Sequence, residues 1–144
     1  MINCFHYSSV TNHSSLTMFF RYNLFGIVWA LIILMLILMP GNNMPDTDIW
    51  SFFTFDKFAH FFVFAVLVFL LIIGYTKQYT YTWLKFNAVK SALITGIAYS
   101  VILECGQALV PQRTFDLVDL LANTVGCFLG SILFYFVYKF NFPN

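Results

Sequence analysis

Apolar residues fill four long stretches of the chain, and short polar segments separate them. The stretches run from Tyr22 to Met39, from Phe58 to Tyr75, from Phe86 to Gln107 and from Leu117 to Phe140. About 20 mostly apolar residues cross a hydrocarbon core as a helix. Backbone groups in lipid must pair within their own segment, so runs of this length favour helices over strands. The pattern predicts an all-α, polytopic membrane protein, built as a bundle of four transmembrane helices.

The composition agrees with a chain that lies in lipid. Of its 144 residues, 60% are hydrophobic and only 9% are charged, and the mean hydropathy is +0.81. A water-soluble domain of this size would leave too much apolar surface in water. Membrane lipids are therefore expected as partners, and no nucleic acid is expected.

Basic residues indicate how the bundle is oriented. Five of the seven fall before the first stretch, between the second and third, or at the end of the fourth: Arg21, Lys77, Lys85, Lys90 and Lys139. These positions share one side of the membrane, which the positive-inside rule makes the cytoplasm. Only Lys57 and Arg113 lie on the other side. Both termini are therefore predicted to be cytoplasmic.

The chain divides into a membrane domain with two short ends. Residues 21–140 are predicted to form the transmembrane domain, and 141–144 a short C-terminal tail. Residues 1–20 are predicted to be a cytoplasmic tail, either disordered or upstream of a true start at Met18. The scattered Cys4, Cys105 and Cys127 give neither a disulfide nor a zinc framework, so no metal or cofactor is predicted.

The acidic residues are confined to two of the polar gaps. All six lie in or beside the first and the third gap: Asp46, Asp48, Asp56, Glu104, Asp116 and Asp119. Both gaps face outward in the predicted topology. The segregation predicts one polar site at the outer end of the bundle.

The second helix brings a histidine to this end. Asp56 and His60 are four residues apart and share a helical face, with Lys57 beside them. A helix cap is a sufficient explanation for Asp56. His60 lies one turn inside an apolar helix, where an ionisable group is costly and usually faces a partner. We therefore expect a polar partner for His60.

The third and fourth helices supply the remaining polar groups. Glu104 and Gln107 end the third helix, and Arg113 follows in the gap. One stripe of the fourth helix carries residues spaced by three and four: Asp116, Asp119, Asn123, Gly126 and Gly130. Small residues allow helices to approach closely, and Gly96 with Ser100 forms a second small stripe on the third helix. The third and fourth helices are expected to pack along these stripes.

A purely structural interpretation is also available. Asp116 would cap the fourth helix, Arg113 would pair with Asp119, and Gln107 would bond Asn123, each such bond being worth about 1 kcal/mol. So many polar groups converging with His60 exceed what packing needs, and ionisable groups in membranes are functional candidates by default. The functional interpretation is favoured.

These residues also resemble a known family. The relevant motifs are Asp56-Lys57-x-x-His60, Glu104-x-x-Gln107 and Pro111-Gln112-Arg113-Thr114-Phe115-Asp116-Leu117-x-Asp119-Leu120-x-Ala122-Asn123-x-x-Gly126-x-x-x-Gly130. In order and topology they are similar to the VanZ-like family of bacterial membrane proteins. The resemblance covers the second to fourth helices, and it departs at Phe64, where the family pattern commonly has Tyr.

The resemblance implies a multi-pass protein of the bacterial cytoplasmic membrane. The family's namesake is associated with resistance to teicoplanin, a glycopeptide that binds cell-wall precursors outside that membrane. The implied function is recognition of an envelope lipid or lipid-linked cell-wall precursor at the outer site, with an effect on glycopeptide susceptibility. Lys57, His60 and Arg113 would bind its anionic group.

Two other functions fit the same residues. The first is a membrane enzyme acting on a phospholipid. In it, Glu104, Asp116, Asp119 and His60 would hold a divalent cation or act as general acid and base. A lipid or proton carrier would use the acids as a relay, and four short helices would then imply a homo-oligomer.

Overall fold

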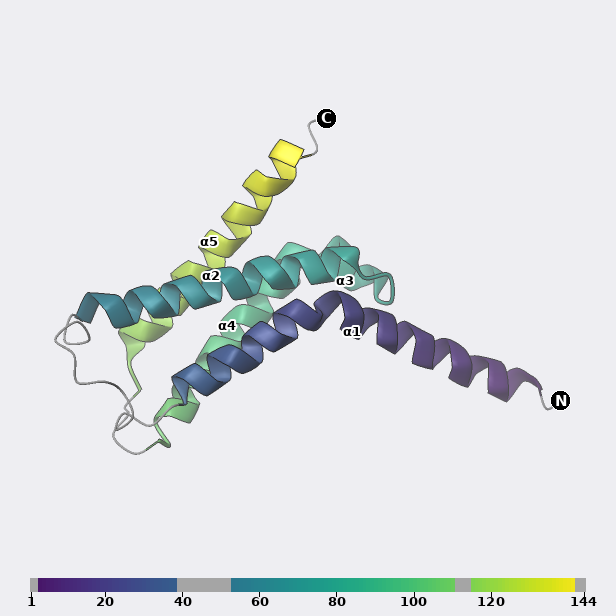
Figure 1. The fold of residues 1–144 in the computed structure, drawn as a ribbon, viewed down its shortest axis with the longest axis horizontal. Coiled ribbons are helices and arrows are strands. Elements are labelled where there is room, and N and C mark those ends of the chain that lie inside the picture. Colours follow the sequence, from purple (N-terminus) through teal and green to yellow (C-terminus); the bar gives the residue numbers. More distant parts are fainter. Residues whose placement is uncertain (1–2, 39–52, 111–114, 142–144) are drawn as a thin grey trace.

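The computed structural model describes residues 3–38, 53–110 and 115–141, with side chains for 16–38, 57–110 and 115–138. Within these ranges the chain forms helices and no strand (Figure 1). The helices are α1 (Asn3–Ile37), α2 (Phe53–Lys77), α3 (Thr82–Phe86), α4 (Ala88–Gln107) and α5 (Leu117–Asn141). The predicted all-α class is therefore confirmed.

Four of these helices are long and apolar enough to cross a membrane. The candidate spans are Leu16–Ile37, Lys57–Lys77, Ala88–Gln107 and Leu117–Tyr138. Four crossings return the chain to the side where it started; which side that is stays a prediction from the basic residues. Helix α1 begins at Asn3, so the segment expected as an N-terminal tail is helical from residue 3 in the structure.

The short helix α3 precedes the third span. The hydrophobic pattern did not predict it as a separate helix. Gln78 holds the turn before this helix, because its Nε2 donates to the carbonyl of Tyr81 and its Oε1 accepts the Tyr81 N–H, both at 2.8 Å. Helix α4 then begins at Ala88, after Asn87 donates to the Trp83 carbonyl at 3.0 Å. The third span therefore starts two residues later than the apolar stretch that predicted it.

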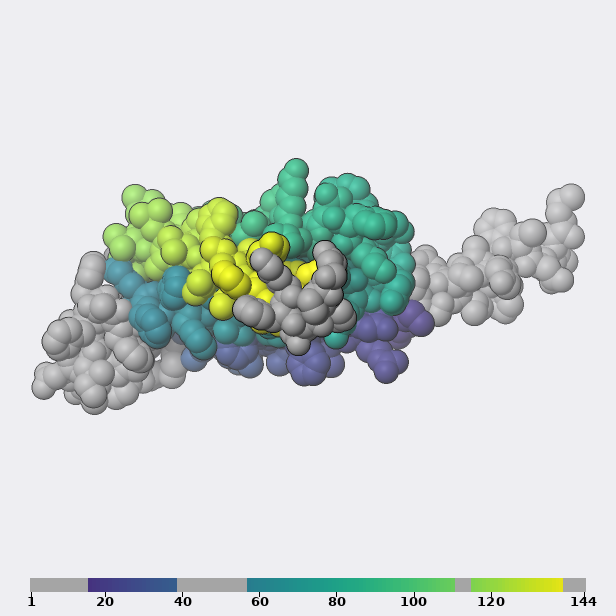
Figure 2. All heavy atoms as spheres, turned by 90° about the horizontal axis from the view of Figure 1, so that it is seen from above, coloured from purple at the N-terminus to yellow at the C-terminus, as the bar shows by residue number. Residues whose placement is uncertain are grey.

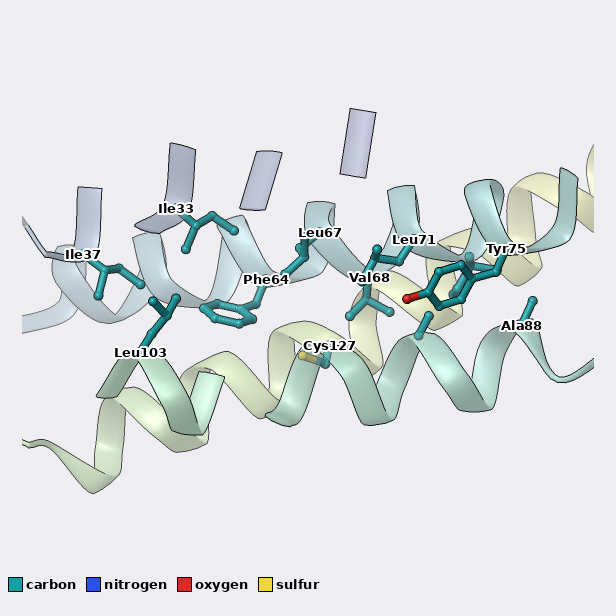
Figure 3. Close-up of a cluster of buried hydrophobic side chains, with 12 residues drawn as sticks. Ile33, Ile37, Phe64, Leu67, Val68, Leu71, Tyr75, Ala88, Leu103 and Cys127 are labelled. Atoms are coloured by element: carbon teal, nitrogen blue, oxygen red, sulfur yellow. The ribbon is translucent and has the colours of Figure 1, made fainter. Parts of the chain in front are cut away.

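Helix α2 lies at the centre of the bundle and packs against each of the other helices. Its inward side chains form half of the apolar core that Figure 3 shows, and residues of α1, α4 and α5 form the rest. Phe64 is fully buried in this core, with its ring centroid 6.3 Å from that of Tyr99. The position that commonly carries Tyr in the family pattern is therefore occupied by an apolar ring among apolar neighbours.

The small stripe of α5 packs on α2, and the expectation that it packs on the third membrane helix was wrong. A Cβ atom at Gly126 would overlap the backbone carbonyl oxygen of Phe61, and one at Gly130 would overlap that of Ala65. Helices α4 and α5 also meet, but at Gly96, where an added Cβ would lie 3.1 Å from Sγ of Cys127. Spacing identifies the small face of a helix but not the helix that covers it.

Large apolar side chains cover the outside of the bundle. Phe25 and Met35 of α1 are 74% and 76% exposed, and Ile102 of α4 is 65% exposed. Figure 2 shows the space-filled surface from above, where α5 in yellow lies beside the teal-green residues that join α2 to α4. A surface of this kind is stable in lipid rather than in water.

Candidate polar site at one end of the bundle

The predicted site residues gather where α2 and α5 begin and α4 ends. Helix α4 runs antiparallel to α2 and α5, so its last turns lie beside their first turns at the left of Figure 1. The described side chains form two groups, each held together by hydrogen bonds or ion pairs. One is centred on Lys57 and the other on Asn123.

Lys57 joins α2 to the start of α5. Its Nζ donates to Oδ2 of Asp116 at 2.9 Å and to Oδ1 of Asp119 at 2.7 Å. The Lys57 side chain is 16% exposed, and those of Asp116 and Asp119 are 37% and 10% exposed. The ammonium group is thus held by two carboxylates, at a position where water screens the attraction only in part.

Asp116 also caps α5, as the structural interpretation of the sequence expected. Its Oδ1 accepts the backbone N–H of Val118 at 2.8 Å, two residues into the chain from the cap position. The Lys57 ammonium and then this N–H lower the pKa of the Asp116 carboxyl below its ordinary value. The capping and pairing roles therefore fall on different oxygens of one residue.

The second group is a buried chain of three side chains from three helices. Nδ1 of His60 lies 3.1 Å from Oδ1 of Asn123, and Nδ2 of Asn123 donates to Oε1 of Glu104 at 3.1 Å. With the amide in this orientation, its oxygen can only accept, so Nδ1 of His60 carries the proton. Nδ1 also lies 3.7 Å from Oε1 of Glu104. The expected polar partner of His60 is thus Asn123, with Glu104 behind it.

Glu104 has one oxygen without a hydrogen-bond partner among the described residues. The residue is completely buried, and its Oε2 is such an atom. A buried carboxylate oxygen left unpaired is costly, so native structures satisfy such atoms with a proton, water or ligand. Oε2 is therefore the point at which this network can accept a further hydrogen bond.

Gln107 contacts the first helix rather than Asn123. Its Nε2 donates to the carbonyl of Ile37 at 3.1 Å, so the expected Gln107–Asn123 pair was wrong. Two further bonds join α1 to the bundle: Trp29 to the Val63 carbonyl at 3.0 Å and Tyr99 to the Ala30 carbonyl at 2.7 Å. The sequence interpretation missed this contribution of α1, because backbone acceptors leave no signal in a sequence.

Two predicted site residues lie outside what the structure describes. Arg113 belongs to residues 111–114, and Asp56 lies in α2 without a described side chain. Asp119, which the structural interpretation paired with Arg113, contacts Lys57, and the pairing with Arg113 lies outside the described residues. Among the described side chains, no three His, Cys, Asp or Glu residues come together as metal ligands would.

Comparison with known families gives a match. The family described as VanZ/LLP1 matches residues 2–138. The chain belongs to the VanZ/LLP1 family. The VanZ/LLP1 match includes the first helix, whereas the motif resemblance covered only the second to fourth membrane helices. No curated protein and no solved structure matches the chain.

The charges of the described site in this VanZ/LLP1 protein are unequal. Three carboxyl groups, those of Glu104, Asp116 and Asp119, accompany the Lys57 ammonium and the His60 imidazole. Since Lys57 is held by two of those carboxylates, an incoming anion would have to compete with them. The described part of the site therefore offers more hydrogen-bond acceptors than positive charge.

Proposed function

We propose that this multi-pass membrane protein lies in the bacterial cytoplasmic membrane and recognises an envelope lipid or lipid-linked cell-wall precursor. The polar end of the bundle would face outward and bind the ligand's headgroup, with an effect on glycopeptide susceptibility of the teicoplanin type. Membership of the VanZ/LLP1 family supports the setting. The observation that carries the proposal is Oε2 of the fully buried Glu104, which has no hydrogen-bond partner among the described residues.

Packing alone does not require this arrangement. Interhelical hydrogen bonds in membranes are worth about 0.6 kcal/mol on average, so a neutral pair would join α4 to α5 equally well. The chain instead places an acid, an amide and an imidazole in contact, with one acid oxygen unpaired. Ionisable groups at membrane depth are costly to bury, so their presence favours a function. Binding of a ligand that completes the hydrogen-bond network is such a function.

The charge balance indicates the chemistry of the ligand. A headgroup with hydrogen-bond donors, such as an ammonium, a hydroxyl or an amide N–H, complements Glu104 and the two aspartates. A phosphate would instead need a cation that is not already paired with two carboxylates. Arg113 is the predicted residue for that role.

The test measures abundance beside function for Glu104→Gln, His60→Ala and Arg113→Ala. Thr124→Ala is the matched control, because the Thr124 hydroxyl only bonds the Leu120 carbonyl of its own helix, at 2.8 Å. We expect normal abundance in bacterial membranes and a changed glycopeptide susceptibility for the three site variants alone. Full activity of Glu104→Gln and His60→Ala at normal abundance would refute the proposal.

The contact between His60 and Glu104 supports a second candidate, an acid–base enzyme acting on a phospholipid. Their Nδ1 and Oε1 atoms are 3.7 Å apart, which is too far for direct proton transfer, so a water molecule or the substrate would have to carry the proton between them. Lipid turnover by the purified protein, lost in Glu104→Gln, would favour this function over binding alone. Retained ligand binding without turnover would exclude it.

A further inference from the structure

The end of the bundle opposite the polar site contains two adjoining cavities. The larger, of about 390 Å³, is lined by Thr76, Lys85, Phe86, Asn87, Ala88, Val89, Lys90, Phe134 and Tyr138. The smaller, of about 340 Å³, is lined by Phe69, Ile73, Thr76, Lys77, Phe134, Val137 and Tyr138. Thr76, Phe134 and Tyr138 line both cavities, so the two are adjacent and together form a depression in this end of the bundle.

The depression lies where α5 turns away from its neighbours. Figure 1 shows the C-terminal half of α5 leaving the line of α2, and Figure 2 shows its yellow end beside the teal-green corner between α2 and α4. The lining residues come from α2, α3, α4 and α5 and from Asn87 between α3 and α4. The cavities therefore occupy the wedge between the end of α2, the short helix α3, the start of α4 and the end of α5.

The two cavities differ in chemistry. Lys85 and Lys90 line the larger one, whereas the walls of the smaller one are aromatic and aliphatic apart from Thr76 and Lys77. Lys85 is held in place by Tyr79, with its Nζ 4.1 Å from the ring centroid. Among the described side chains, no acidic residue lines either cavity. A cationic cavity thus adjoins an apolar one.

We propose that an anionic phospholipid binds in this depression. Its headgroup phosphate lies in the larger cavity against Lys85 and Lys90, and one acyl chain follows the smaller cavity along Phe69, Ile73 and Val137. Basic pockets between transmembrane helices bind anionic lipid headgroups in this way. The adjacent apolar cavity favours a lipid over a free phosphate, because a free phosphate has no acyl chain to bury there.

This proposal does not depend on the function proposed for the polar site. The lipid enters from the leaflet at the opposite end of the bundle, which the basic residues predict to be the cytoplasmic one. Its role is to fill the wedge beside α5, so it binds whether or not the polar end has a ligand.

The test uses the purified full-length protein in nanodiscs of phosphatidylcholine that contain some phosphatidylglycerol. Native mass spectrometry after transfer to detergent counts the lipids that the protein retains. We expect retained phosphatidylglycerol, and a loss of at least about fivefold in Lys85→Gln/Lys90→Gln, since each basic residue near a lipid surface contributes measurably. Arg21→Gln is the matched control, because Arg21 is exposed, lies on the same predicted side and lines neither cavity.

Further variants test the two halves of the depression separately. Lys85→Arg/Lys90→Arg keeps both charges and should retain the lipid, and Val137→Trp fills the apolar cavity and should reduce retention. Equal loss in Arg21→Gln, equal retention of phosphatidylcholine, or displacement of the lipid by inorganic phosphate would each overturn the proposal. Circular dichroism establishes that the variants compared have the same helicity.

Discussion

The imidazole of His60 and the amide of Asn123 meet inside the bundle, with Nδ1 and Oδ1 3.1 Å apart. The two residues come from α2 and α5, and both are buried. Asn123 also bonds Glu104 of α4, so one amide connects three membrane helices.

Asn123→Leu is expected to destabilise the protein by about 2–4 kcal/mol, because it leaves both His60 and Glu104 buried without this partner. Thermal unfolding in detergent measures the loss. Thr124→Ala, on the neighbouring position of the same helix, should change the free energy of unfolding by less than about 1 kcal/mol. Equal stabilities of the two variants would contradict the network.

Lys57 and Asp119 should show energetic coupling. A double-mutant cycle with Lys57→Met and Asp119→Asn is expected to give a coupling energy of about 1–2 kcal/mol, because both side chains are mostly shielded from solvent. Unfolding of the four proteins in one detergent provides the measurement. Strictly additive losses would mean that the ion pair contributes nothing.

Gly126→Ala is expected to lower both abundance and stability. The new Cβ would meet the backbone carbonyl of Phe61, which cannot move without displacing α2 from α5. Gly106→Ala is the control, because the nearest atom to its Cβ is Leu38 Cδ2 at 3.4 Å. Membrane abundance and melting temperature should fall for Gly126→Ala and stay near wild type for Gly106→Ala.

The stability of the polar end is expected to depend on pH through Asp116. Folding lowers the pKa of this carboxyl from its ordinary value of 3.8, so its contribution is complete above that value. It is lost as the pH falls through the lower pKa of the folded state. Unfolding measured between about pH 6 and pH 3 should show a steeper acid loss for wild type than for Asp116→Asn. Parallel curves would mean that the pairing with Lys57 is not formed.

The sequence predicted the residues of the polar site better than their partners. Helical spacing placed Asp116, Asp119 and Asn123 on one face, because the period of a helix is fixed by its geometry. It gave no information on which helix that face meets. Gly126 was therefore assigned to the wrong neighbour, and Gln107 was matched to Asn123 although it bonds a backbone carbonyl.

The four membrane spans were predictable for a different reason. Lipid requires long apolar helices, so hydropathy alone located the four spans. The short helix Thr82–Phe86 was not predicted, because the turn before it depends on Gln78 folding back onto Tyr81. Local side-chain to backbone bonds of this kind have no periodic signature.

The first half of helix α5 has one side that faces protein and one side that faces outward. Asp119, Asn123, Gly126 and Gly130 are buried against protein, whereas Leu117, Leu121 and Val125 are 65%, 63% and 56% exposed. The outward positions need only to be apolar, so many side chains satisfy them. The inward positions admit few substitutions. Tolerance to mutation along this part of α5 should therefore rise and fall with the period of the helix, because a single helix carries both kinds of position.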